Sequence, residues 1–192
     1  MTNSLMWFRY DLRLIDNHAF FEASKSKYCL PIFILDKNFT KLSTTSSFHL
    51  SFLKDSLVEL QKNLINHDSF LNYFEGETIE VFKFLLEKYS IKTVYSNKIF
   101  KNLFFTHFDK QVSNFFKSKH IKWIQTNQFG IQLGNRVRGK WASDWNNFIT
   151  EPIKTSILKT NFIKLEDSQK IILLKQKPKN IQTGGEKIAM NL

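Results

Sequence analysis

The amino-acid sequence predicts an α/β protein with a doubly wound, five-stranded parallel sheet, helices on both faces of the sheet, and a basic C-terminal extension. Short apolar segments rich in Ile, Val and aromatic residues alternate with longer segments whose apolar side chains recur every three or four residues. This alternation implies right-handed crossovers, which place successive strands parallel in a Rossmann-like arrangement. The expected strands are residues 4–8, 29–35, 70–74, 92–95 and 121–125.

The segments between these strands have the apolar spacing of helices that bury one face. Asp16 or Asn17 suits the N-cap of a short helix ending near Ala23, since either side chain accepts hydrogen bonds from the first free N–H groups. Three further stripes recur at helical spacing and are interpreted as core. They are Leu53, Leu57, Leu60 and Leu64; Ile79, Phe82, Leu86 and Tyr89; and Phe104, Phe108, Val112 and Phe115.

The α/β alternation covers residues 1–126 and then stops, which divides the chain into three parts. Residues 127–152 are expected to form a basic loop and a short amphipathic helix around Trp141 and Trp145, which together close the domain. Residues 153–192 are Lys-rich without a clear period. We expect them to form a linker with little structure of its own.

The composition is typical of a folded protein in a reducing compartment. The 192 residues include twenty Phe and four Trp, which supply ample material for a core. Cys29 is the single cysteine, which excludes an internal disulfide and a cysteine-based zinc site. No apolar run approaches the roughly 20 residues of a membrane-spanning helix. We therefore expect a cytoplasmic protein without a membrane partner.

Positive charge is concentrated in the second half of the chain. Residues 1–100 hold twelve Lys or Arg against eleven Asp or Glu, whereas residues 101–192 hold sixteen against six. A basic half beside a neutral half is typical of a surface that meets phosphate. An AT-rich genome, which favours lysine, explains the same composition. Charge alone therefore leaves contact with DNA open.

Ligands of doubly wound folds bind beyond the carboxyl ends of the strands. This rule selects the loops that open at Arg9, Asp36 and Ser96. The sequence contains no recognisable catalytic triad, pair of catalytic carboxylates, metal-ligand cluster or glycine-rich dinucleotide loop. We therefore expect a binding site and name no catalytic or metal-ligating residue.

The arginines are more informative than the lysines. Only four of the 28 basic residues are arginines, and they form two clusters: Arg9 with Arg13, and Arg136 with Arg138. An arginine among many lysines indicates a site that uses its planar five-donor fork, which binds carboxylate or phosphate. The alternative is an internal ion pair between the first cluster and Asp11, Asp16 or Asp36.

The first arginine cluster lies in a recognisable motif. Residues 7–17, WFRYDLRLIDN, closely resemble the first strand and loop of the DNA photolyase/cryptochrome family. Further similar motifs follow in the family's order and extend the resemblance over nearly the whole chain. They are LPIFILD at 30–36, the helix motif at 52–60, VYSN at 94–97, QFG at 128–130, GKWA at 139–142 and GGE at 184–186. The last of these resembles the start of the family's helical flavin domain.

The resemblance implies an N-terminal domain that holds an antenna chromophore and a helical C-terminal domain that holds FAD and damaged DNA. In the family, light absorbed by the antenna passes to reduced flavin, which donates an electron to a pyrimidine dimer and splits it. This chain stops where the second domain would begin. FAD is therefore expected only on a missing C-terminal domain. We expect no repair by this chain alone, because the electron donor has no place to bind.

The resemblance also implies the residues of an antenna site between the loops after strands one and four. Arg9 and Arg13 would contact polar or anionic groups of the chromophore. Asp11, Asp36 and Asn97 would supply hydrogen-bond acceptors.

The identity of the antenna depends on a departure from the family pattern. Folate-binding members carry a carboxylate shortly after the asparagine that Asn97 matches, whereas residues 97–101 here read NKIFK. A lysine cannot accept the hydrogen bonds of a pterin ring. The sequence therefore favours a deazaflavin or flavin over a folate, and leaves open that no antenna binds.

Our leading hypothesis is the antenna-type α/β domain of a deoxyribodipyrimidine photolyase-family protein. It would be a truncated product or one half of a split enzyme whose separate chain carries the FAD domain. DNA would be reached indirectly, through that flavin domain. The alternatives are a stand-alone module that binds a nucleotide-like ligand or a partner, and an inactive fragment.

Overall fold

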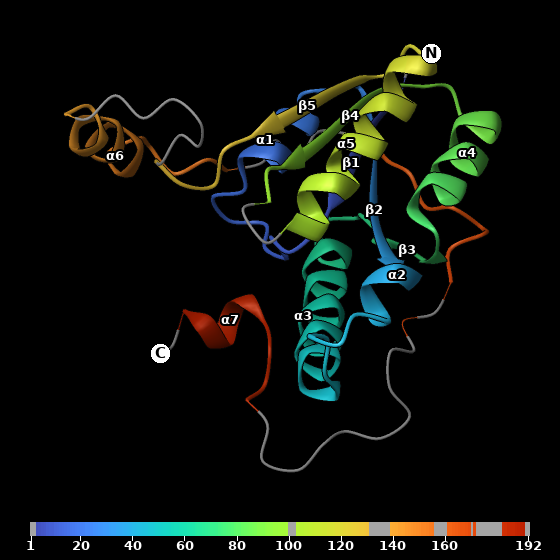
Figure 1. The fold of residues 1–192 in the computed structure, drawn as a ribbon, viewed down its shortest axis with the longest axis horizontal. Coiled ribbons are helices and arrows are strands. Elements are labelled where there is room, and N and C mark those ends of the chain that lie inside the picture. The colour runs from blue at the N-terminus through green and yellow to red at the C-terminus, as the bar shows by residue number, and fades with distance from the viewer. Residues whose placement is uncertain are drawn as a thin grey trace.

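The computed structural model describes residues 3–99, 103–130, 139–155, 161–169, 171 and 182–190. Its centre is a parallel sheet with the strand order β3-β2-β1-β4-β5, and helices cover both faces (Figure 1). This confirms the predicted doubly wound, five-stranded sheet. A short sixth strand, β6, also pairs parallel with β2.

The elements follow the predicted alternation. The strands are β1 (Asn3–Phe8), β2 (Tyr28–Asp36), β3 (Asn72–Gly76), β4 (Ile91–Asn97), β5 (Lys122–Thr126) and β6 (Asn161–Phe162). The helices are α1 (His18–Ala23), α2 (Lys37–Thr40), α3 (Ser47–Ile65), α4 (Thr78–Lys88), α5 (Leu103–Ser118), α6 (Trp141–Ile149) and α7 (Glu186–Ala189). The sequence patterns do not predict α2, β6 or α7. Within the described ranges, no helix combines the length and apolar character that a membrane crossing requires.

The pleat of β1 divides the core into two layers. Met6 and Phe8 pack on the side of α1 and α3, whereas Leu5 and Trp7 pack on the side of α4 and α5. All four side chains are at most 3% exposed. Because both faces of the sheet are covered, β1 and β2 are nearly continuous apolar runs and do not alternate apolar with polar residues.

The strand order determines where a ligand site can form. The chain places β2 and β3 on one side of β1, and then β4 and β5 on the other. The connections that leave β1 and β4 therefore diverge at the carboxyl edge of the sheet, which is the position of binding crevices in this class of fold. The predicted loops at Arg9 and Ser96 lie at this edge.

Residues 161–169 extend the sheet beside β3. β6 pairs with Tyr28 and Cys29 at the start of β2, ahead of the point where β3 begins its pairing. Leu165 is 3% exposed and joins the core on the side of α4 and α5. The Lys-rich composition does not indicate these contacts. The predicted domain boundaries stay predictions, and residues 172–181 of the basic extension lie outside the described residues.

Replacement of Asn72 by alanine is expected to lower the free energy of unfolding by about 2 kcal/mol and to release residues 161–169 from the sheet. The amide is buried: Nδ2 donates to the carbonyls of Pro31 and Ile163, both at 2.9 Å, and Oδ1 accepts the N–H of Leu165 at 2.7 Å. Alanine removes the hydrogen-bond partner of the Pro31 carbonyl, the Ile163 carbonyl and the Leu165 N–H. Urea denaturation measures the loss of stability. Unchanged amide exchange at Leu165 in the variant would contradict the expected release.

Candidate ligand site

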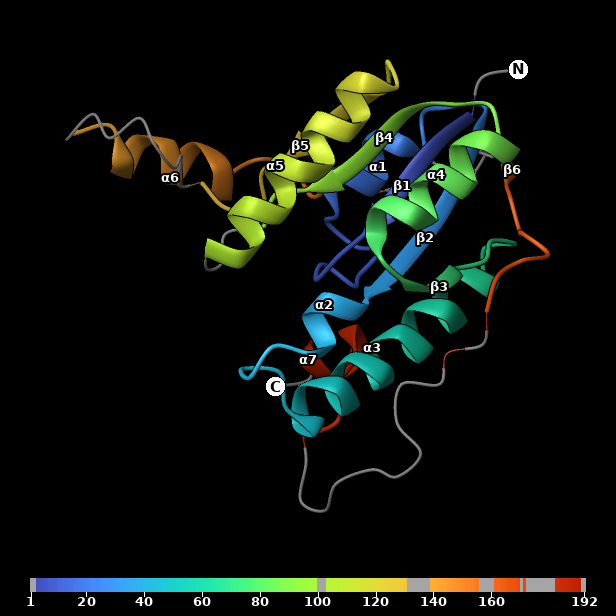
Figure 2. The ribbon, with the colours of Figure 1, turned by 45° about the vertical axis from the view of Figure 1, so that its right-hand side comes forward.

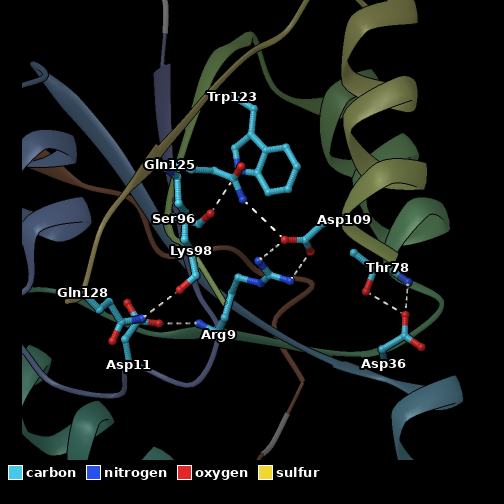
Figure 3. Close-up of polar contacts among 10 residues, drawn as sticks. All are labelled: Arg9, Asp11, Asp36, Thr78, Ser96, Lys98, Asp109, Trp123, Gln125 and Gln128. Atoms are coloured by element: carbon cyan, nitrogen blue, oxygen red, sulfur yellow. Dashed lines mark hydrogen bonds and ion pairs between the residues drawn. The ribbon is translucent and has the colours of Figure 1, made fainter. Parts of the chain in front are cut away.

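The loop after β1, residues 9–17, is held by a buried carboxylate. Asp11 is 2% exposed, and its Oδ1 accepts the backbone N–H of Arg9 at 3.0 Å (Figure 3). Its Oδ2 accepts the side-chain amides of Asn17 and Asn97 at 3.1 and 2.5 Å. Because a buried charge requires such donors, this carboxylate stabilises the loop.

Asn97, the last residue of β4, ties the loop to the sheet. Besides its bond to Asp11, Nδ2 donates to Oδ1 of Asn17 at 2.9 Å, and Oδ1 of Asn97 accepts the hydroxyl of Thr126 at the end of β5. Asn17 also accepts the N–H of Phe20 at 3.0 Å and is the N-cap of α1, as one of the two predicted candidates. The network therefore joins β1, β4, β5 and α1.

Arg9 lies beside α5 and forms a two-pronged ion pair. Its Nη1 and Nη2 donate to the carboxylate of Asp109 at 3.1 and 2.5 Å (Figure 3), and its guanidinium carbon lies 4.5 Å from the centre of the Trp7 ring. Sequence reasoning did not name Asp109 as a partner. The position of Asp109 could have indicated that it faces the sheet, because it falls at helical spacing between Phe105 and Val112, which are both buried.

Asp36 ends β2 and fixes the starts of two helices. Its Oδ1 accepts the N–H of Asn38 at 2.7 Å and caps α2. Its Oδ2 accepts the N–H and the hydroxyl of Thr78, the first residue of α4, at 2.9 and 2.7 Å (Figure 3). The carboxylate thereby positions α2, whose Phe39 lines a large cavity.

A cavity of about 1160 Å³ opens between the β1–α1 loop, α2, the first half of α3 and α7. Its aromatic lining consists of Tyr10, Phe39, Phe48, Phe52 and Phe105. Phe48 and Phe52 are 52% and 44% exposed because they lie off the leucine stripe with which α3 packs on the sheet. Sequence reasoning did not assign this lining to a site. Aromatic residues outside the buried stripe of a helix are the signal that could have identified it.

Arg13 is, among the described residues that line the cavity, the one with a permanent positive charge. Its Nε donates to the carbonyl of Ile15 and its Nη2 to that of Asp16, both at 3.2 Å. These bonds hold the guanidinium and use two of its five N–H donors. The second arginine cluster, Arg136 and Arg138, lies outside the described residues.

Tyr10 contributes a neutral aromatic surface to the cavity. Its ring meets those of Phe39 and Phe105 edge to face, with ring centres 5.7 and 5.5 Å apart. Burial raises the pKa of its hydroxyl well above the usual value, and the nearby positive charge of Arg9 acts in the opposite direction. The hydroxyl therefore stays protonated at neutral pH.

The five residues predicted for the site lie at one edge of the sheet but do not converge on one cavity. Asp11 and Arg13 line the large cavity. Arg9 and Asp36 border a second void of about 30 Å³, and Asn97 borders neither of these two spaces. The roles of all five residues as ligand contacts stay predictions.

Comparison with known proteins links this geometry to a family. The family model for DNA photolyase matches residues 4–129. Cryptochrome DASH of Arabidopsis thaliana is 32% identical over 102 residues, which are 50% of this chain and 18% of that protein. The chain therefore spans a minor part of this relative.

Solved structures of photolyases share this fold. An archaeal photolyase from Sulfolobus tokodaii, solved with two FAD molecules that imply a novel light-harvesting cofactor, matches with a TM-score of 0.79 and 23% identity. A bacterial class III photolyase from Agrobacterium tumefaciens matches with a TM-score of 0.80 and 19% identity. The matches cover 99% and 100% of this chain but only 45% and 43% of those chains.

Proposed function

Because this chain belongs to the DNA photolyase family, we propose that it is a light-harvesting α/β domain whose large cavity holds a flavin or deazaflavin. Such a chromophore, when bound, supplies visible-light absorption. The observation that carries the proposal is the aromatic-lined cavity of about 1160 Å³ with the Arg13 guanidinium in its wall.

The lining fits a flat aromatic ring system that bears an anionic chain. Phenylalanine and tyrosine rings pack favourably with another ring through stacked or edge-to-face contacts. The guanidinium of Arg13 suits a phosphate or carboxylate, which it binds with two parallel hydrogen bonds. The cavity of about 1160 Å³ exceeds the roughly 300–1,000 Å³ of sites for drug-sized ligands, and this size suits a flavin nucleotide.

A flavin or deazaflavin is proposed in preference to a folate. The resemblance implies that folate-binding members use a carboxylate shortly after the residue that Asn97 matches, and Lys98 follows here. The amide of Asn97 already donates to Asp11 and Asn17. Phe100 and Lys101 also lack a carboxylate, and both lie outside the described residues.

We further propose that repair of pyrimidine dimers requires a second domain or a separate chain that carries FAD. This chain spans 45% of the archaeal photolyase and 18% of the plant cryptochrome. In this arrangement it would capture light and reach DNA only through its FAD-bearing partner. We propose a cytoplasmic location, since the single cysteine, Cys29, is a buried free thiol, as a reducing compartment favours.

Replacement of Arg13 by glutamine is expected to weaken the binding of FMN about tenfold or more. A charge-assisted hydrogen bond contributes about 1.5–3 kcal/mol, and about 1.4 kcal/mol corresponds to a factor of ten in Kd. The full chain is titrated with FMN, and quenching of flavin fluorescence gives Kd. Visible absorbance that co-elutes with the protein in gel filtration shows retention independently.

The matched control is Lys41→Gln, which removes one positive charge at the exposed end of α2, outside the cavity. We expect it to leave Kd unchanged. Equal affinity of the Arg13→Gln variant and the unaltered chain would contradict the role of Arg13. Failure of the unaltered chain to retain FMN, FAD or a deazaflavin would contradict the proposed function.

A further inference from the structure

Residues 182–190, here called the C-terminal clasp, lie beside α3 and the β1–α1 loop. Figure 2 shows α7, which belongs to the clasp, next to α3. Five clasp residues line the large cavity: Gln182, Gly185, Glu186, Ala189 and Met190. One wall of the proposed chromophore site is therefore built by the far end of the chain.

Glu186 connects the clasp to the loop that carries Arg13. Its Oε2 accepts the backbone N–H of Leu14 at 3.2 Å, and its Oε1 accepts that of Ile15 at 3.1 Å. The carbonyl of Ile15 in turn accepts Nε of Arg13. Glu186 thus holds the same short backbone segment that orients the guanidinium.

Two glycines allow the clasp to lie directly on α3. A Cβ atom at Gly184 would collide with the backbone carbonyl oxygen of Phe52, and Gly185 has a φ of +133°, which disfavours other residues. The backbone N–H of Lys187 donates to Oε1 of Glu59 on α3 at 2.6 Å. The Gly-Gly-Glu sequence therefore matches the α3 surface on one side and the β1–α1 loop on the other.

We propose that Glu186 is a positioning residue for the chromophore. By docking the clasp it closes one side of the cavity and fixes the backbone next to Arg13, so that retention of the ligand depends on clasp docking. This inference rests on the proposed function of the cavity. Because coupling between two binding events is reciprocal, a bound chromophore strengthens the docking of the clasp by the same factor.

Glu186→Ala is expected to raise the dissociation rate of FMN about tenfold, which corresponds to about 1.4 kcal/mol. The association rate changes little, because mutations in one binding site act mainly on dissociation. Stopped-flow fluorescence measures both rates.

Two further measurements report on the position of the ligand and of the clasp. The visible circular dichroism of bound FMN is expected to weaken in the Glu186→Ala variant, because the ligand is held in a less fixed orientation. Hydrogen exchange without ligand shows faster exchange at the Leu14 and Ile15 amides, and Glu186→Gln, which keeps one acceptor oxygen, gives intermediate values.

Two further variants separate the clasp from general damage. Lys187→Ala alters the neighbouring side chain but keeps the backbone N–H that binds Glu59, and is expected to match the unaltered chain. Gly184→Ala displaces the clasp from α3 with the Glu186 carboxylate intact, and is expected to reproduce the faster release of FMN. Thermal denaturation verifies that each variant is folded.

The outcomes distinguish this inference from the proposed function. If the unaltered chain binds FMN and the Glu186→Ala and Gly184→Ala variants release it at the same rate, the role of the clasp is overturned and the proposed function stands. Faster exchange of the Leu14 and Ile15 amides without faster release of FMN leads to the same conclusion. In that case the contact of Glu186 with the loop stabilises the fold but does not affect the ligand. If the unaltered chain binds no flavin or deazaflavin, both are overturned.

Discussion

Replacement of Asp109 by alanine is expected to lower the free energy of unfolding by about 3 kcal/mol, because it leaves the Arg9 guanidinium buried without its counter-ion. The side chain of Arg9 is 2% exposed and that of Asp109 is 22% exposed. Water therefore cannot replace the two lost hydrogen bonds of Arg9, and stacking on Trp7 offsets only part of the loss. Urea denaturation at pH 7 measures the change.

The control for this prediction is Asp167→Ala, which breaks an ion pair in solvent. Oδ2 of Asp167 lies 2.5 Å from Nζ of Lys88, and the two side chains are 38% and 46% exposed. The hydrogen bond to Asp167 raises the pKa of Lys88, but solvent screens an exposed pair, and we expect the denaturation midpoint to change little. Equal losses in the two variants would show that burial does not set the strength of the Arg9–Asp109 pair.

Replacement of Asn97 by aspartate is expected to lower the free energy of unfolding at pH 7 by about 3 kcal/mol or more. The change keeps the shape of the side chain but exchanges the Nδ2 donor, 2.5 Å from Oδ2 of Asp11, for an oxygen. Two carboxylates then face each other in a buried network. The bond to Asn17 is lost as well.

The loss in the Asn97→Asp variant is expected to depend on pH. The two carboxylates repel each other, so the folded state raises the pKa of the pair above the unfolded value of about 3.9. The folded variant therefore holds a proton that the unfolded chain releases. Its stability relative to the unaltered protein falls as the pH rises from about 4 and levels off above the folded pKa.

Urea denaturation of both proteins between pH 4 and pH 7 measures this dependence. Asn114→Asp, which places the same charge on the exposed side of α5, serves as the control and is expected to show no such trend. A loss that is constant between pH 4 and pH 7 would contradict the repulsion between the two carboxylates.

These two predictions also bear on the interpretation of Arg9 and Asn97 as ligand contacts. Both side chains form several hydrogen bonds within the protein. Their first role is therefore to hold the β1–α1 loop at the edge of the sheet. Among the described residues, Arg13 donates to nearby carbonyls of that loop and also lines the cavity, which supports its proposed contact with a ligand.

The class of fold could be read from local patterns. The apolar runs of β1 and β2 and the leucine stripe of α3 each report burial within a window of a few residues, since side chains alternate along a strand and recur every three or four residues along a helix. The N-cap of α1 at Asn17 is equally local. The family motif at residues 7–17 identified the loop that borders the cavity.

Only the tertiary structure decided which distant residues meet in the site. Arg9 and Asp109 are 100 positions apart, and Leu14 and Glu186 are 172 apart. Periodicity shows that a side chain is buried or exposed, but its partner depends on where each crossover places the next element. The sequence by itself therefore determined the five-stranded sheet and the long helices between its strands, and it predicted the edge of the sheet at which a ligand would bind. The ion pair of Arg9, the aromatic wall of the cavity and the docking of the clasp required the packed chain, because these contacts form between segments that no local pattern connects.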